Sequence, residues 1–124
     1  MWTIDRTKEI ASWIKDLDDD AKEAIYKSLL ILKEFGPLLG RPYADSVNES
    51  KHKNMKELRV TNKKRLYRIL FVFDPERTAL LLIGGDKRGD KRFYQRMIPL
   101  ADKLYDQHLE ELRKKHENTG NKQK

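Results

Sequence analysis

Apolar residues recur at helical spacing in two consecutive stretches near the N-terminus. The first stretch, residues 7–17, has an i, i+3, i+4, i+7 stripe formed by Ile10, Trp13, Ile14 and Leu17. Three aspartates at residues 18–20 then suit the start of a second helix, because acidic side chains are favourable at a helix N-terminus. That helix is expected to end at Gly36, which precedes a proline. The pattern predicts a helical hairpin after a short opening strand at residues 2–5.

The periodicity changes from helical to strand-like after a long loop. Residues 37–55 have no sustained period and are expected to form that loop. Three apolar runs follow, at residues 55–60, 65–74 and 78–85, and their short connections predict an antiparallel meander. The middle run is apolar at both alternating positions from Ile69 to Phe73, so we expect it to be central and covered on both faces.

A last helix completes the predicted order β-α-α-β-β-β-α. It is expected to begin near Asp90 and to kink or restart at Pro99. The order predicts an α+β fold in which a small, mainly antiparallel sheet packs on the N-terminal helical hairpin. We expect a single domain over residues 1–115 and a polar, disordered tail over residues 116–124.

The positive charge of the chain is concentrated in two windows. The formal net charge is +7 and the pI about 9.6, which favours a polyanionic partner such as nucleic acid. Residues 51–68 and 84–96 together carry a net charge of +10, so the rest of the chain carries −3. The absence of cysteine excludes a disulfide framework, thiolate ligands and a Cys nucleophile.

Other candidate chemistry and targeting signals are missing from the sequence. His108 and His116 lack partners at metal-ligand spacing, so no metal site or cofactor is predicted. No apolar run has the length of a transmembrane helix, and the first residues lack the layout of a signal peptide. We therefore expect a cytoplasmic protein.

Strand alternation places several charged residues on one face of the predicted sheet. Arg68 shares parity with the apolar Leu70 and Val72, so it should lie at the edge of a buried zone. Glu57 and Arg59 share one face of the preceding strand. Arginine forks beside aromatic rings are typical of single-stranded RNA recognition. Alternatively, the cations only protect a sheet edge, and Glu57 is only the salt-bridge partner of an arginine.

Several segments follow one another in a particular order over residues 1–112. They are GRPYADSV, SKHKNMKELR, RILFVFD, LLLIGGDK, and Tyr94 with IPLADKLYDQHL. Together they resemble the RelE/ParE superfamily of toxins, in the HigB-like branch related to phage Gp49-type proteins. The resemblance implies a RelE-like fold and the toxin of a type II toxin–antitoxin pair, with a helix-turn-helix antitoxin as partner. RelE-like members cleave mRNA on the ribosome and ParE-like members poison DNA gyrase, so the fold alone does not choose between them.

The chemistry of RNA cleavage favours the RelE-like activity. Metal-free attack by a 2′-OH needs a base, cations around the phosphate and an acid for the leaving oxygen. By resemblance, Arg68 matches the phosphate-stabilising arginine, and Lys87 and Arg88 match the acid or phosphate ligand, with Asp86 inserted. Tyr94, seven residues past Lys87, matches the tyrosine that stacks on a base.

The general base is the main departure from the RelE pattern. Basic residues of RelE-like toxins on the preceding strand correspond to Glu57 and Arg59, so a glutamate replaces the lysine at the base position. Glu57 is the first candidate for the base. His52 and Asp45, both in the long loop, are the alternatives.

These observations leave three functions open. The first is a ribosome-dependent mRNA endoribonuclease that inhibits translation, with mRNA, the ribosome and, through the antitoxin complex, operator DNA as partners. The second is a gyrase inhibitor, and the third is a non-catalytic nucleic-acid-binding module or inactivated toxin. In the first, general RNA attraction is assigned to eight basic residues: Lys51, Lys53, Lys56, Lys63, Lys64, Arg65, Lys91 and Arg92.

Overall fold

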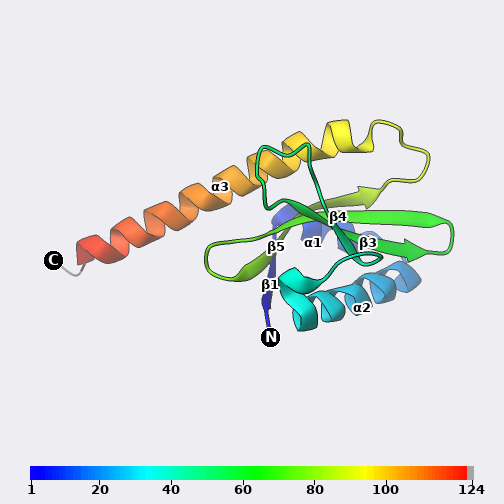
Figure 1. Ribbon diagram of the computed structural model, residues 1–124, viewed down its shortest axis with the longest axis horizontal. Helices are drawn as coiled ribbons and strands as arrows, with labels where there is room; N and C mark the ends of the chain where they lie inside the picture. The colour runs from blue at the N-terminus through cyan, green and yellow to red at the C-terminus, as the bar shows by residue number, and fades with distance from the viewer. Residues whose placement is uncertain (123–124) are drawn as a thin grey trace.

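A five-stranded sheet with helices on both faces makes up the fold, which confirms the α+β class (Figure 1). A computed structural model describes residues 1–122 of the chain, with side chains through Glu117. The elements are β1 (Thr3–Arg6), α1 (Lys8–Lys15), α2 (Asp19–Phe35), η1 (Gly36–Leu38), β2 (Ala44–Ser46), β3 (Lys56–Asn62), β4 (Arg65–Phe73), β5 (Thr78–Asp86) and α3 (Phe93–Lys122). The strand order is β1-β5-β4-β3-β2, with β1 parallel to β5 and the other neighbours antiparallel.

Local signals at the ends of α1 and α2 produce the helical hairpin, as predicted. Thr7 Oγ1 accepts a hydrogen bond from the Ile10 amide at 3.2 Å, and Asp18 Oδ1 accepts one from the Ala21 amide at 2.8 Å. Each cap satisfies an amide that has no partner within its helix. Gly36 ends α2 with a φ of +56°, and a Cβ there would lie 2.2 Å from the indole ring of Trp2. Glycine is therefore required at this turn.

Strand β4 is central and buried on both faces. Ile69 and Phe71 pack against α1 and α2, while Leu70 and Val72 pack towards α3, and all four residues are 0% exposed. Burying each such side chain contributes about 1.5–3 kcal/mol to stability. The predicted hairpin thus covers one face of the sheet, and α3 covers the other (Figure 1).

The structure departs from the expected elements in three places. The long loop contains the strand β2, whose three residues are too few to show an alternating pattern. Helix α3 continues through Pro99, which lies in its second turn and removes a single backbone hydrogen bond. The tail expected to be disordered from residue 116 instead continues α3 to Lys122, while residues 123–124 lie outside the described part.

The C-terminal half of α3 extends beyond the sheet (Figure 1). Arg113 pairs there with Glu110 and Glu117, at i−3 and i+4. Such pairs support a helix that lacks an apolar stripe. Within residues 1–122, no helix has both the length and the apolar character needed to cross a membrane.

Candidate active site

The sheet face that packs on α3 becomes polar beyond its apolar core. On β4, Arg68 continues the row that Leu70 and Val72 begin. Arg59 on β3 lies directly opposite Arg68 in the register, and Glu57 lies two residues before it. Residues that face each other across an antiparallel pair project from the same side of the sheet. Strand pairing therefore brings Glu57, Arg59 and Arg68 together beneath the start of α3.

Glu57 lies at the centre of this polar cluster and is only 5% exposed. The hydroxyl of Tyr94, from α3, donates a hydrogen bond to Glu57 Oε1 at 2.5 Å. Arg59 Nη1 donates to Oε2 at 3.3 Å, and Arg68 Nε lies 3.7 Å from Oε1. A buried carboxylate is stable only when it is paired in this way. The two arginines and the phenol together surround the carboxylate of Glu57.

Arg68 is 4% exposed and is incompletely paired. Its Nη1 donates to the backbone oxygen of Tyr67 at 3.0 Å. Its Nε has no hydrogen-bond acceptor. Every other buried side-chain nitrogen or oxygen among the residues that the structure describes has a hydrogen-bond partner. Leaving a buried donor unsatisfied costs about 1–3 kcal/mol, and more for a charged group. Arg68 Nε is thus a buried donor that lies near Glu57 without forming a hydrogen bond.

Tyr94 is kept protonated by its surroundings. Burial raises the pKa of its hydroxyl to about 12, with help from the hydrogen bond and negative charge of Glu57, while Arg68 acts in the opposite direction. Tyr94 is therefore a hydrogen-bond donor at neutral pH. The Nζ of Lys87 lies over the tyrosine ring, 5.4 Å from its centroid, so the predicted acid or phosphate ligand also lies at this site.

Gly85 allows α3 to approach the sheet closely enough to form the cluster. It lies opposite Arg68 in the β4–β5 register. A Cβ at this position would lie 3.1 Å from the ring of Phe93 and 3.3 Å from the terminal methyl of Met97. The close neighbours of Gly85 therefore come from α3.

Asp86, the inserted residue, organises the chain as it leaves β5. Its carboxylate accepts hydrogen bonds from the amides of Leu66 and Arg88 and from the side chain of Arg65. Burial alone would raise the pKa of Asp86, but these bonds and the charge of Arg65 lower it. The side chain of Arg88 lines a separate hollow beside the β3–β4 turn, together with Asp18, Asn62, Lys63, Lys64, Arg65 and Asp86. Arg88 is therefore not part of the Glu57 cluster.

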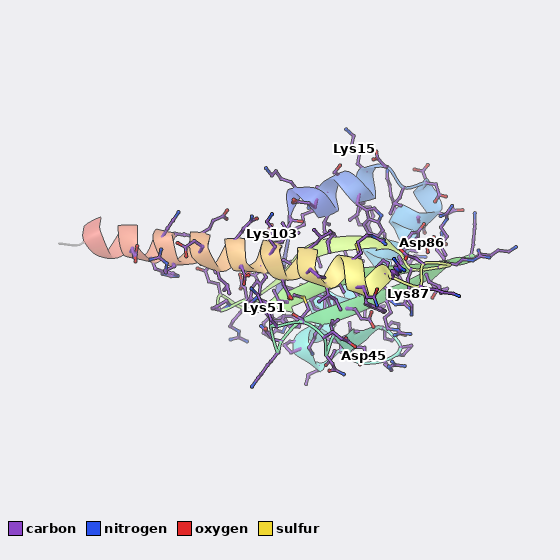
Figure 2. All side chains as sticks on the ribbon, turned by 90° about the horizontal axis from the view of Figure 1, so that it is seen from above. Lys15, Asp45, Lys51, Asp86, Lys87 and Lys103 are labelled. Carbon is purple, nitrogen blue, oxygen red and sulfur yellow. The ribbon has the colours of Figure 1, made fainter. Side chains whose placement is uncertain are left out.

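His52 also lies away from Glu57. Its Nε2 is 2.8 Å from Asp106 Oδ1, and its ring contacts Tyr105 edge-on with centroids 4.7 Å apart. Asp106 is twelve residues beyond Tyr94 on α3, which corresponds to about 18 Å of helix. Figure 2 shows Lys51, the neighbour of His52, further along α3 than Lys87.

Asp45, the other alternative base, lies beside Glu57. The two residues are directly opposite each other in the β2–β3 register. The carboxylate of Asp45 is bound by Arg41, with Nη2 at 2.7 Å and Nε at 2.8 Å. The hydrogen bond from Arg41, followed by one from the Ser46 amide, lowers the pKa of Asp45. Asp45 adds a second carboxylate to the edge of the cluster, but its charge is already compensated.

The eight basic residues predicted to attract RNA are spread over several surfaces. Three of them pair with acids, in the contacts Lys51–Asp106, Lys63–Asp20 and Arg65–Asp86. Lys56 Nζ donates to the backbone oxygen of Pro37 at 3.4 Å, on the opposite face of the sheet. The three residues paired with acids are exposed, and so are the remaining four, Lys53, Lys64, Lys91 and Arg92.

A recess beside Tyr94 is a feature that the sequence analysis did not anticipate. Glu49 and Gln95 line it, and neither residue lies in a motif or shares a pattern that would single it out.

Within the described residues, no group of three or more His, Cys, Asp or Glu side chains could hold a metal ion. The carboxylate of Glu57 can accept a proton, and the arginines beside it, Arg59 and Arg68, can bind an anion.

Known proteins are similar to this chain in sequence and in fold. Residues 12–106 match the family described as "Phage derived protein Gp49-like (DUF891)". The chain is 42% identical over 110 residues to "Putative toxin HigB2" of Mycobacterium tuberculosis, an alignment that covers 87% of this chain and 54% of that protein. It is 46% identical over 95 residues to "Putative toxin HigB3" of the same organism, which covers 76% of this chain and 82% of that protein. The chain thus spans about half the length of the first relative.

One solved structure has the same overall fold. A mutant of the Escherichia coli toxin RelE in the free state superposes with a TM-score of 0.55 at 11% sequence identity. The superposition covers 77% of this chain and 94% of that chain. The superposition shows that the two proteins share a fold. Because the identity is so low, the function has to be argued from the site.

Proposed function

Because this chain belongs to the family of phage-derived Gp49-like proteins and has the fold of RelE, we propose that it is the toxin of a type II toxin–antitoxin pair. We propose further that it is a metal-independent endoribonuclease whose substrate is mRNA on the ribosome. One observation carries the enzymatic part of this proposal. Arg68 is buried beside Glu57 with an unsatisfied Nε donor, an arrangement that suits a phosphate oxygen.

The residues of the cluster suit cleavage by the neighbouring 2′-hydroxyl. Glu57 takes the proton of the 2′-hydroxyl while the O2′ atom of the ribose attacks the adjacent phosphorus. The new P–O2′ bond forms as the P–O5′ bond breaks, which leaves a 2′,3′-cyclic phosphate and a 5′-hydroxyl. Arg68 and Arg59 stabilise the charge that develops on the phosphate oxygens, and the ammonium of Lys87 protonates the leaving 5′-oxygen.

Tyr94 gives a reason for dependence on the ribosome. In the free protein its hydroxyl occupies Glu57 Oε1, the oxygen nearest to Arg68. Releasing a hydrogen bond to a charged group costs about 1.5–3 kcal/mol, which corresponds to a factor of about 10 to 150 in rate. Free RNA must supply this energy alone, whereas a ribosome that positions the mRNA lowers the cost of binding.

The proposal is tested by expressing Arg68→Ala and Lys87→Ala variants and mapping mRNA 5′ ends after induction. Each variant should relieve growth arrest and remove the new 5′ ends. Arg113→Ala is the matched control, because Arg113 is exposed on the far part of α3 and should remain toxic. Thermal unfolding of the purified variants checks that Arg68→Ala still folds. Full toxicity and unchanged cleavage in both site variants would refute the proposed site.

Further measurements separate the other candidate functions. Inhibition of supercoiling by the purified protein, without any mRNA cleavage, would indicate a gyrase inhibitor instead. Salt-dependent RNA binding without cleavage would indicate a non-catalytic module. The partner that we propose, a helix-turn-helix antitoxin acting in the cytoplasm, is tested by co-expressing the adjacent reading frame and measuring whether growth is restored.

A further inference from the structure

A recess beside Tyr94 has the composition of a nucleobase site. It is lined by Glu49, Lys91, Tyr94, Gln95, Ile98 and Pro99. The first turns of α3 form one wall, and Glu49, from the loop after β2, forms the other. Lys87, which covers the tyrosine ring, does not line the recess.

The recess combines an apolar floor with three free polar groups. Tyr94 and Ile98 are four residues apart on α3, so they lie on the same side of the helix. A carboxylate, an ammonium group and an amide surround them, from Glu49, Lys91 and Gln95. Among the described residues, none of these three side chains makes a hydrogen bond or an ion pair. Free polar groups around an apolar, aromatic floor are typical of a small-ligand site.

We infer that this recess binds a guanine base next to the scissile phosphate, an inference that rests on the proposed ribonuclease function. The carboxylate of Glu49 accepts hydrogen bonds from guanine N1–H and N2–H. Lys91 and Gln95 donate to the acceptors O6 and N7. Adenine and cytosine present an acceptor where guanine presents N1–H, so the carboxylate disfavours them. Stacking on Tyr94 adds base-independent affinity.

The position of Tyr94 connects this recess to the catalytic cluster. Its hydroxyl contacts Glu57, and the same residue lines the recess. A nucleotide with its phosphate at Arg68 therefore has its base beside the tyrosine ring. Glu49 is a specificity residue in this arrangement, because it contacts the base, whereas Glu57 and Arg68 contact the reacting atoms.

The inference is tested by binding a short RNA that is 2′-O-methylated throughout and so cannot be cleaved. Fluorescence anisotropy compares one sequence that carries guanine, inosine, adenine or cytosine at a single position. Inosine lacks the N2 amino group, so the wild-type protein should bind guanine about fivefold or more tightly than inosine and adenine. Glu49→Gln should reduce this preference to within about twofold. Glu111→Gln, an exposed position on the far part of α3, should preserve it.

The outcomes separate this inference from the proposed function. Equal binding of all four RNAs, no binding of any of them, or a guanine preference that survives Glu49→Gln overturns the guanine site. None of these results depends on cleavage, because the probe cannot react. Loss of cleavage is read from 5′-end mapping, so a protein that selects guanine without cutting RNA would contradict only the catalytic proposal.

Discussion

Replacing Tyr94 with phenylalanine removes one hydroxyl from the buried cluster and leaves the ring in place. That hydroxyl donates to the carboxylate of Glu57 at 2.5 Å. A hydrogen bond to a charged group contributes about 1.5–3 kcal/mol, and Glu57 keeps Arg59 and Arg68 as partners in the variant. We expect Tyr94→Phe to lower the free energy of unfolding by about 2 kcal/mol near neutral pH.

The pH dependence of this difference is set by the raised pKa of Tyr94. The hydroxyl has a pKa of about 12 in the folded protein and about 10 in the unfolded chain. Its stabilising effect is therefore complete below pH 10 and is lost as the pH rises from about 10 to 12. The gap between wild type and Tyr94→Phe should close over that range.

Denaturant unfolding of both proteins between pH 7 and pH 12 measures this gap. A double-mutant cycle with Glu57→Ala, which removes the acceptor, isolates the contact, and its coupling energy should be about 1.5–3 kcal/mol. A difference below about 0.5 kcal/mol at neutral pH would refute the contact, since surface substitutions produce effects of that size. A gap that stays constant up to pH 12 would instead show that the pKa of Tyr94 is not raised.

Two further predictions concern the general base and the packing of α3. Glu57→Gln should lower the rate of cleavage of ribosome-bound mRNA by about 100-fold or more. His52→Ala should change this rate little, because His52 is bound to Asp106. If His52→Ala had the larger effect, the general base would lie in the loop. Gly85→Ala should destabilise the protein by about 1–3 kcal/mol in denaturant unfolding, because its Cβ would press on the start of α3. Gly40→Ala, which meets nothing within 4 Å, should be nearly neutral, and an equal effect of the two substitutions would contradict the close packing at Gly85.

Elements defined by local chemistry could be predicted from the sequence. The caps at Thr7 and Asp18 and the stop at Gly36 set the ends of the hairpin through bonds to nearby residues. Alternation along the strands likewise placed Arg68 on the face of Leu70 and Val72. Both rules depend on residues a few positions apart, so they hold before the tertiary structure is known.

Contacts between distant segments could not be predicted in this way. The bond from Tyr94 to Glu57 depends on how α3 crosses the sheet, which Gly85 controls through contacts that no periodicity reveals. The attachment of His52 to α3 depends on the path of a long loop without a pattern. The sequence suggested the residue types of the site, and only the three-dimensional arrangement separated Glu57 from His52.

The pairing of β1 with β5 joins the first strand of the chain to the last. Thr3 lies beside Thr78 in the parallel register, and the Thr7 amide donates to the backbone oxygen of Leu81. Contacts across so much sequence form only after the intervening chain has been made. During translation the helical hairpin thus emerges long before the strand that completes its core, and Lys87 and Tyr94 follow later still. A nascent chain that stops before Tyr94 therefore lacks two side chains of the proposed active site.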